Sequence, residues 1–155
     1  MSTQAVTTRF ATVTAYLSWD HQRLDTILTE IAADLARDRL PEARAWFAGF
    51  YAGLDRHIRL EEELLFPLFE ARSGIINGPT AVMRDEHGRM RSALESMQAA
   101  LQDGSAPRFF EALRFLQSLL PEHDAKEEHV LYPATDRMLT DAERTSFVAR
   151  LERER

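Results

Sequence analysis

The sequence predicts an all-α protein: an antiparallel four-helix bundle of two pseudo-symmetric helical hairpins, followed by a short C-terminal helix. Apolar residues recur every three or four positions along nearly the whole chain, and no segment alternates with the period of two typical of a strand. Only six glycines and six prolines occur in 155 residues, which indicates long elements and few turns. The chain also repeats itself at an offset of 66 residues, so that each half is expected to form one hairpin.

Breaks between the apolar stripes define the expected helices, at about residues 12–37, 41–72, 80–102, 107–137 and 141–153. Pro41 suits the first position of a helix, segments with glycine and proline separate the next helices, and a Thr-x-x-Glu capping box opens the last one. Pro67 and Pro133 are expected to bend or weaken the last turns of the second and fourth helices, and Pro121 to kink the fourth. The length is that of one domain, residues 1–155.

Composition excludes several classes of protein. The chain has no cysteine, which excludes a disulfide framework, a thiolate zinc site, a cysteine-ligated iron–sulfur cluster and a cysteine nucleophile. A net charge of −6 argues against general nucleic-acid binding. No apolar run is long enough to span a membrane, and residues 1–10 lack the apolar region of a signal peptide, so a cytoplasmic location is expected.

Six polar residues interrupt the apolar stripes while sharing the buried face of their helices. They are His21, His57, Glu61, His87, His123 and Glu127. Spacings of three and four residues keep side chains on one helix face, and the repeat places one cluster in each hairpin. Burying such groups without partners is costly, whereas a pair of cations would neutralise the carboxylates and use the imidazoles. Nitrogen and carboxylate ligands suit iron, manganese or zinc.

Other interpretations apply to single residues. Any one of the histidines could be a hydrogen-bonded core residue, and each His-x-x-x-Glu could be a local pair. His129 falls off the stripe and is expected to face solvent, whereas Val130 and Leu131 are both assigned to the buried stripe. The carboxylates beside the ligands are expected at the surface or behind the ligands; these are Glu62, Glu63 and Glu128. Five further residues are interpreted as packing: Phe66, Tyr132, Met83, Met90 and Met97.

The doubled pattern His-x-x-x-Glu-Glu-x-x-Leu-(Phe/Tyr)-Pro, together with His21 and His87, resembles the hemerythrin-like, or HHE cation-binding, family over nearly the whole chain. The resemblance implies a four-helix bundle around a non-haem di-iron centre. Glu61 and Glu127 would bridge the two metals, and the four histidines on the stripes would be terminal ligands. The expected cofactor is two iron ions with an oxo or hydroxo bridge, for which manganese or zinc could substitute.

Two departures from the oxygen-carrying hemerythrins stand out. They have a further histidine where this chain has Arg91, and an aspartate five residues after the last histidine, where Glu127 here follows at four. The symmetric set is closer to bacterial hemerythrin-like proteins and to di-iron proteins of iron–sulfur cluster repair, whose cysteine-containing N-terminal extension is absent here. Ferritin-like sites use Glu-x-x-His, the reverse order at a different spacing, and are excluded.

Three functions are compatible with such a site. With about four protein ligands for each iron, positions stay open for oxygen, nitric oxide, peroxide or a small anion, which favours a binding or sensing protein over a turnover enzyme. The alternatives are iron storage, iron donation or cluster repair, and a purely structural metal site that holds the bundle closed. The expected partner is a small gas or anion, and neither nucleic acid nor a membrane is expected; the sequence does not indicate whether a protein partner exists.

Overall fold

The computed structural model describes residues 8–154, and these residues form helices and connecting turns without a strand, which confirms the all-α prediction. The expectation that no leader peptide is present concerns residues 1–10, most of which lie outside the described part. Within residues 8–154, none of the helices combines the length and apolar character that a membrane crossing requires.

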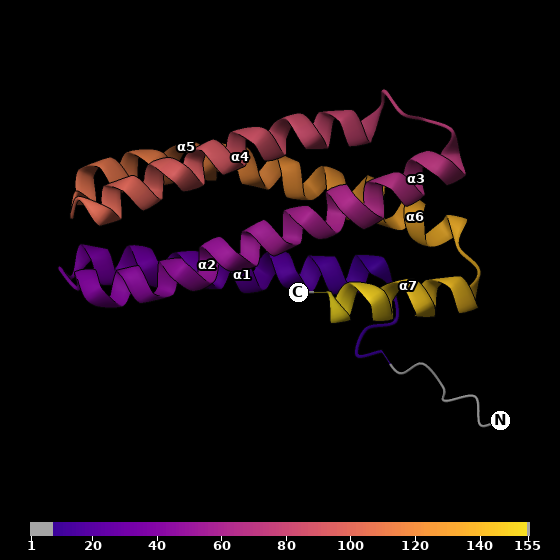
Figure 1. Cartoon of the computed structure of the whole chain (residues 1–155), viewed down its shortest axis with the longest axis horizontal. Helices are drawn as coiled ribbons and strands as arrows, with labels where there is room; N and C mark the ends of the chain where they lie inside the picture. The colour runs from indigo at the N-terminus through magenta and orange to yellow at the C-terminus, as the bar shows by residue number, and fades with distance from the viewer. Residues whose placement is uncertain (1–7, 155) are drawn as a thin grey trace.

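Four long helices run along the molecule in two pairs (Figure 1). In the first half of the chain α1 (Val13–Ala36) packs against α2 (Leu40–Leu60), and in the second half α4 (Pro79–Gln102) packs against α5 (Ala106–Lys126). Two shorter helices continue the second helix of each pair: α3 (Phe66–Ser73) follows α2, and α6 (Tyr132–Met138) follows α5. The last helix, α7 (Asp141–Arg153), lies against α1. In each half of the sequence the two long helices therefore pack against each other.

Local signals explain where the helices start and stop. The Thr12 hydroxyl accepts the N–H of Ala15 at 2.9 Å and caps α1. The predicted capping box of α7 is present, with Thr140 and Glu143 each accepting the other's backbone N–H. Gly74 ends α3 in the left-handed region at φ 75°, a conformation that glycine adopts without a steric penalty.

The second and fourth expected helices are interrupted by π-helical turns, η1 (Glu61–Leu65) and η2 (Glu127–Leu131). In each turn a backbone carbonyl accepts the N–H five positions ahead: that of Glu61 accepts from Phe66, and that of Glu127 accepts from Tyr132. Pro67 and Pro133 follow directly; because proline lacks an N–H and collides with the carbonyl four residues back, the wider turn relieves a local conflict. Pro121 lies within α5, and the kink expected there stays a prediction.

The extra residue of each π turn changes which side chain faces the core. Val130, assigned to the buried stripe from the sequence, is 56% exposed, whereas Leu131 is 1% exposed. The assignment of Val130 was therefore wrong, because it extrapolated an α-helical period across a π-helical turn. The same shift leaves Leu64 half-buried and buries Leu65.

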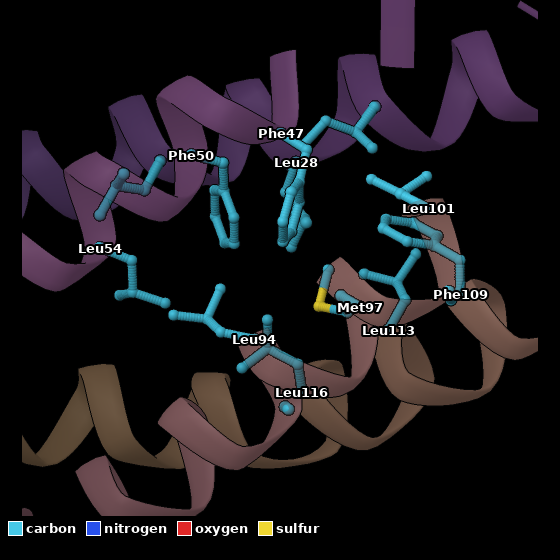
Figure 2. Close-up of a cluster of buried hydrophobic side chains, with 14 of the residues drawn as sticks. Leu28, Phe47, Phe50, Leu54, Leu94, Met97, Leu101, Phe109, Leu113 and Leu116 are labelled. Atoms are coloured by element: carbon cyan, nitrogen blue, oxygen red, sulfur yellow. The ribbon is translucent and has the colours of Figure 1, made fainter. Parts of the chain in front are cut away.

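Two apolar clusters enclose the middle of the bundle. In the larger one, Phe47 and Phe50 of the first hairpin face Leu94 and Met97 of the second (Figure 2). The smaller one surrounds Phe66 and Tyr132 at the opposite end. Met83, Met90 and Met97 are at most 2% exposed, so their interpretation as packing residues is confirmed. The six candidate ligands fall along the helices between these clusters, where little water reaches them.

Candidate metal centre

The structure brings the six side chains predicted as ligands together in the interior, each at most 7% exposed. They come from both hairpins: His21 from α1, His57 and His123 from the ends of α2 and α5, His87 from α4, and Glu61 and Glu127 from the π turns. Their donor atoms form two groups, within each of which all atoms lie within 4.8 Å of one another. The groups are Glu61, His87, His123 and Glu127, and His21, His57 and Glu127.

The imidazoles present their Nε2 atoms to the two central carboxylates. Each carboxylate meets one histidine from either hairpin: Glu61 Oε1 lies 3.3 Å from Nε2 of His57 and His87, and Glu127 Oε1 lies 3.2 Å from His21 and 3.1 Å from His123. This crossing arrangement ties the hairpins together through polar contacts. It also directs four nitrogen and two carboxylate ligands toward one small volume, as a two-metal site requires.

A further carboxylate stands behind each imidazole at Nδ1. Asp20 Oδ2 lies 2.9 Å from His57 Nδ1, and Glu86 Oε1 lies 3.0 Å from His123 Nδ1. The others are Glu128, 3.2 Å from His21 Nδ1, and Glu62, 3.5 Å from His87 Nδ1. A carboxylate at Nδ1 keeps the proton on that atom and leaves the Nε2 lone pair free for a metal.

Two of these four residues were missed by sequence reasoning. Asp20 and Glu86 are the acidic residues directly before His21 and His87, so each binds a histidine of the neighbouring helix rather than its own neighbour in sequence. The available signal was that both repeats carry an acidic residue at this position. Glu62 and Glu128 are half-buried behind their histidines, one of the two places expected for them.

Tyr132 is more than the packing residue that the sequence suggested. Its hydroxyl donates to Glu61 Oε2 at 2.7 Å. The hydroxyl oxygen of Tyr132 also lies 3.1 Å from Glu127 Oε1, 3.2 Å from His21 Nε2 and 3.3 Å from His57 Nε2. The ring is packed as predicted, in the smaller apolar cluster, but the prediction was incomplete, because a buried ring position does not indicate which groups the para hydroxyl contacts. The signal that could have found it is tyrosine where the first repeat has phenylalanine.

The remaining expectations near the site concern Phe66, Arg91 and His129. The Phe66 ring stacks on His87 with centroids 5.6 Å apart, so it is a packing residue as expected. The Arg91 guanidinium lies on the outside of the bundle, 2.5 Å from Asp55 Oδ1 and 3.9 Å from Glu62 Oε1, the carboxylate behind His87. His129 is exposed, as its position off the stripe predicts.

The buried carboxylates strongly perturb the histidines. Burial alone would lower the pKa of His21, but its hydrogen bond to Glu127 and the charges of Asp124 and Glu127 raise that pKa to about 10. At His87, burial alone would likewise lower the pKa, but the carboxylates of Glu61, 3.3 Å from Nε2, and Glu62, 3.5 Å from Nδ1, raise that pKa to about 9. Both imidazoles therefore bind protons tightly, and any cation must displace those protons.

The two central carboxylates differ from each other. Burial and the negative charge of Glu127 raise the pKa of Glu61. Burial acts in the same direction at Glu127, but hydrogen bonds with Glu61, His123 and His21 keep its pKa well below the usual range. Burial and both carboxylate charges push the pKa of Tyr132 far above its ordinary value, so the phenol keeps its proton. The pair therefore favours sharing one proton, because two adjacent buried charges repel.

Unpartnered atoms indicate that a ligand belongs here. Among residues 8–154, six buried side-chain nitrogen or oxygen atoms lack a hydrogen-bond partner, and four of them lie in this cluster. The four are Glu61 Oε1, His87 Nδ1, His87 Nε2 and Glu127 Oε2. Glu61 Oε1 lies 3.3 Å from His87 Nε2, and Glu62 lies 3.5 Å from His87 Nδ1, but these contacts do not have hydrogen-bond geometry. Buried polar atoms are nearly always paired, so four orphans in one cluster need an explanation. Nitrogen and oxygen donors that converge on one volume fit first-row transition-metal ions.

Access to the cluster is unequal on its two sides. A groove of about 520 Å³ between α1 and α5 is lined partly by Asp25, Leu120 and Asp124, and these three residues also line the small cavity that reaches the histidines. On the opposite side the repeat places Ile58, which is 0% exposed, where Asp124 stands here. At this point the groove between α1 and α5 therefore presents a carboxylate where the other half of the repeat has an apolar side chain.

Comparisons with known proteins agree with this geometry. A family model described as the hemerythrin HHE cation binding domain matches residues 12–135. A DNA nickase of Nostoc sp. (strain PCC 7120 / SAG 25.82 / UTEX 2576) is 30% identical over 115 residues, which make up 74% of this chain and 31% of that protein. The chain thus spans under a third of the length of this curated relative. No solved structure matches the chain.

Proposed function

The chain belongs to the family of hemerythrin HHE cation-binding domains, and from this premise we propose that it binds two iron ions and, through them, a small ligand such as oxygen or nitric oxide. The observation that carries the proposal is the set of four orphan atoms inside a cluster of four imidazoles and two carboxylates. We also propose that the two hairpins form the antiparallel four-helix bundle expected from the sequence, with the metals between them.

The ligand assignment follows from the two donor groups. Glu127 belongs to both groups, and Glu61 Oε1 faces a histidine of each hairpin, so these carboxylates would bridge the metals. The terminal ligands would be His21, His57, His87 and His123, with manganese or zinc as substitutes for iron. When bound, iron would supply open coordination positions and one-electron redox chemistry.

The protein's own residues hold the ligands in position and control what reaches them. Asp20 and Glu86 keep a proton on Nδ1 of His57 and His123, which leaves Nε2 directed inward. On one side the small cavity beside the histidines is lined by apolar residues such as Phe50, Leu54 and Met90. A narrow apolar lining excludes bulky organic substrates and admits small gases, which favours binding or sensing over turnover of larger molecules.

A second function, iron storage or donation, is favoured by one observation. The acidic groove between α1 and α5 would attract cations and leads toward His21. Rapid loss of iron to a mild chelator would support this function. Iron that stays bound but does not react with gases would favour a structural site instead.

The activity in the relative's printed name needs its own test, because that protein is much longer than this chain. With a net charge of −6, we propose that this chain takes a small gas or anion as its partner and not nucleic acid. Incubating the iron-loaded chain with supercoiled plasmid checks this. A nicked product would show that DNA cleavage extends to this chain.

Elemental analysis and stopped-flow absorbance test the main proposal. Protein purified from iron-replete cells should contain about two iron atoms per chain. The reduced protein should change its visible spectrum within seconds of mixing with oxygen or nitric oxide, and the oxidised protein should take up azide. One iron per chain at full occupancy would count against a two-metal site. Two bound irons without any spectral change would leave the structural site as the better explanation.

A further inference from the structure

We infer that Tyr132 is a seventh metal-binding side chain, whose phenol oxygen completes the cation position next to His21 and His57. The inference rests on the metal binding proposed above, but it concerns a residue outside the doubled His-x-x-x-Glu motif. It predicts that the two cation positions differ in composition although the repeat makes the six motif ligands symmetric.

The two donor groups are unequal without the tyrosine. Glu61, His87, His123 and Glu127 offer four side chains to one position, whereas His21, His57 and Glu127 offer only three to the other. First-row metal ions take at least four ligands, and where fewer protein donors are offered, water completes the set. With Glu61 Oε2 engaged by the Tyr132 hydroxyl, the second position has one protein donor fewer than the first.

The phenol oxygen lies where the missing donor is needed. It is 3.2 Å from His21 Nε2, 3.3 Å from His57 Nε2 and 3.1 Å from Glu127 Oε1. Ligands bound to one ion at about 2.1 Å are separated from one another by roughly 3.0–3.4 Å in octahedral and tetrahedral geometries. The oxygen thus stands at ligand-to-ligand distance from all three members of the deficient group.

The hydrogen bond of Tyr132 leaves its lone pairs available. The hydroxyl proton is directed to Glu61 Oε2 at 2.7 Å, the shortest of its contacts. A phenol has one proton, so its oxygen lone pairs face His21 and His57, whereas Glu127 Oε1 is a second, more distant acceptor for the hydroxyl at 3.1 Å. The oxygen can therefore bind a cation as a neutral donor while its proton stays in the bond to Glu61.

The other half of the repeat supports the assignment. Phe66 occupies the position equivalent to Tyr132 and stacks on His87, a member of the group that already has four donors. The hydroxyl is thus present beside the three-residue group with His21 and His57, and it is absent beside the four-residue group with His87. This pattern is what a ligand role predicts, and simple packing would not require it.

The test compares wild type with Tyr132→Phe, a change that removes one oxygen atom and keeps the ring. Tyr51→Phe is the matched control, because Tyr51 lies on α2 against Phe47, with ring centroids 6.1 Å apart, outside both donor groups. Anaerobic titration with ferrous iron against a competing chelator should give two binding steps in wild type and in the control. In Tyr132→Phe the first step should be unchanged, and the second should weaken by roughly tenfold or more.

A spectroscopic measurement on the wild type does not depend on how well the variant folds. Titration with zinc, which has no visible absorption of its own, should give an ultraviolet difference signal of tyrosine with the second equivalent. That signal should be missing in Tyr132→Phe and retained in Tyr51→Phe. Its absence from wild type, with two zinc ions bound, would overturn the inference.

The outcomes separate this inference from the proposed function. If the wild type binds no metal, both fail. If Tyr132→Phe binds two ferrous ions with unchanged affinities, only the role of Tyr132 fails. If the variant binds the second ion more tightly, Tyr132 competes with the cation instead of binding it, and the inference is overturned.

Discussion

Replacing Asp20 by asparagine should destabilise the metal-free protein by about 2 kcal/mol at pH 7. Asp20 is 1% exposed and binds His57 Nδ1 at 2.9 Å and Arg23 Nε at 2.8 Å. Burial opposes its ionisation, but the hydrogen bonds and charges of His57 and Arg23 lower its pKa from 3.8 to about 2. A shift of that size corresponds to roughly 2 kcal/mol in favour of the ionised form in the fold, and the neutral amide loses this contribution.

The sign of the pH dependence follows from the lowered pKa. A carboxyl that is more acidic in the folded than in the unfolded state stabilises the fold above pH 3.8, and this contribution disappears as the pH falls toward 2. The stability gap between wild type and Asp20→Asn should therefore be full at pH 7 and should narrow below about pH 4. In the iron-loaded protein the same change should weaken metal binding roughly tenfold or more, because His57 loses the partner of its Nδ1.

Urea denaturation at pH 7, 5, 4 and 3 in the presence of a chelator measures the gap. Asp85→Asn is the matched control, since Asp85 lies on α4 at the surface and pairs with Arg89 at 2.9 Å, where an ion pair contributes little. A loss for Asp20→Asn no larger than for Asp85→Asn, or a gap that does not change with pH, would refute the reasoning.

Three further predictions concern the metal and the core. Glu61→Ala should abolish most metal binding and the rise in melting temperature that accompanies it, whereas His129→Ala should change neither. Elemental analysis with calorimetry checks this prediction. An equal loss of metal in both variants would show that the assignment of Glu61 to the buried helix face and of His129 to the exposed face is wrong. Metal affinity should rise with pH from 7 toward 9–10, because His21 and His87 carry protons that a cation must displace, their pKa values being raised to about 10 and about 9. A proton-release titration tests this prediction, and a metal affinity that does not change with pH would contradict it. Phe50→Ala should cost about 3–5 kcal/mol, because Phe50 is 1% exposed inside the larger apolar cluster, and urea denaturation should show a loss well above 1 kcal/mol.

The site shows how far a repeated pattern can be followed. The spacing of Leu17, His21 and Leu24 places the imidazole on the buried face, and the equivalent spacing places His87 there in the second hairpin. The sequence therefore predicts which six side chains turn inward. It does so because helical periodicity is a local property, and the burial of apolar neighbours then fixes the face of the polar residue between them.

The π turns lie beyond such local reasoning. From the sequence, residues 41–72 and 107–137 were each expected to form one helix, whereas the structure inserts a wider turn at Glu61 and at Glu127. One added residue per turn rotates the following side chains, which exposes Val130 and buries Leu131. The sequence contains Pro67 and Pro133 as signals of a disturbance, but a proline alone does not say whether the helix bends, ends or widens.

What the sequence by itself determined is therefore the all-helical class, the two-hairpin repeat and the inward-facing His and Glu residues, since all of these follow from periodicity along a helix. Only the tertiary structure decided the partners across helices: Asp20 behind His57, Glu86 behind His123, and the Tyr132 hydroxyl among the ligands of both hairpins. Those contacts join residues 37 to 111 positions apart, except for Glu127 with Tyr132 across the π turn. The distance between residues so far apart in sequence depends on how whole helices pack, which no local spacing contains.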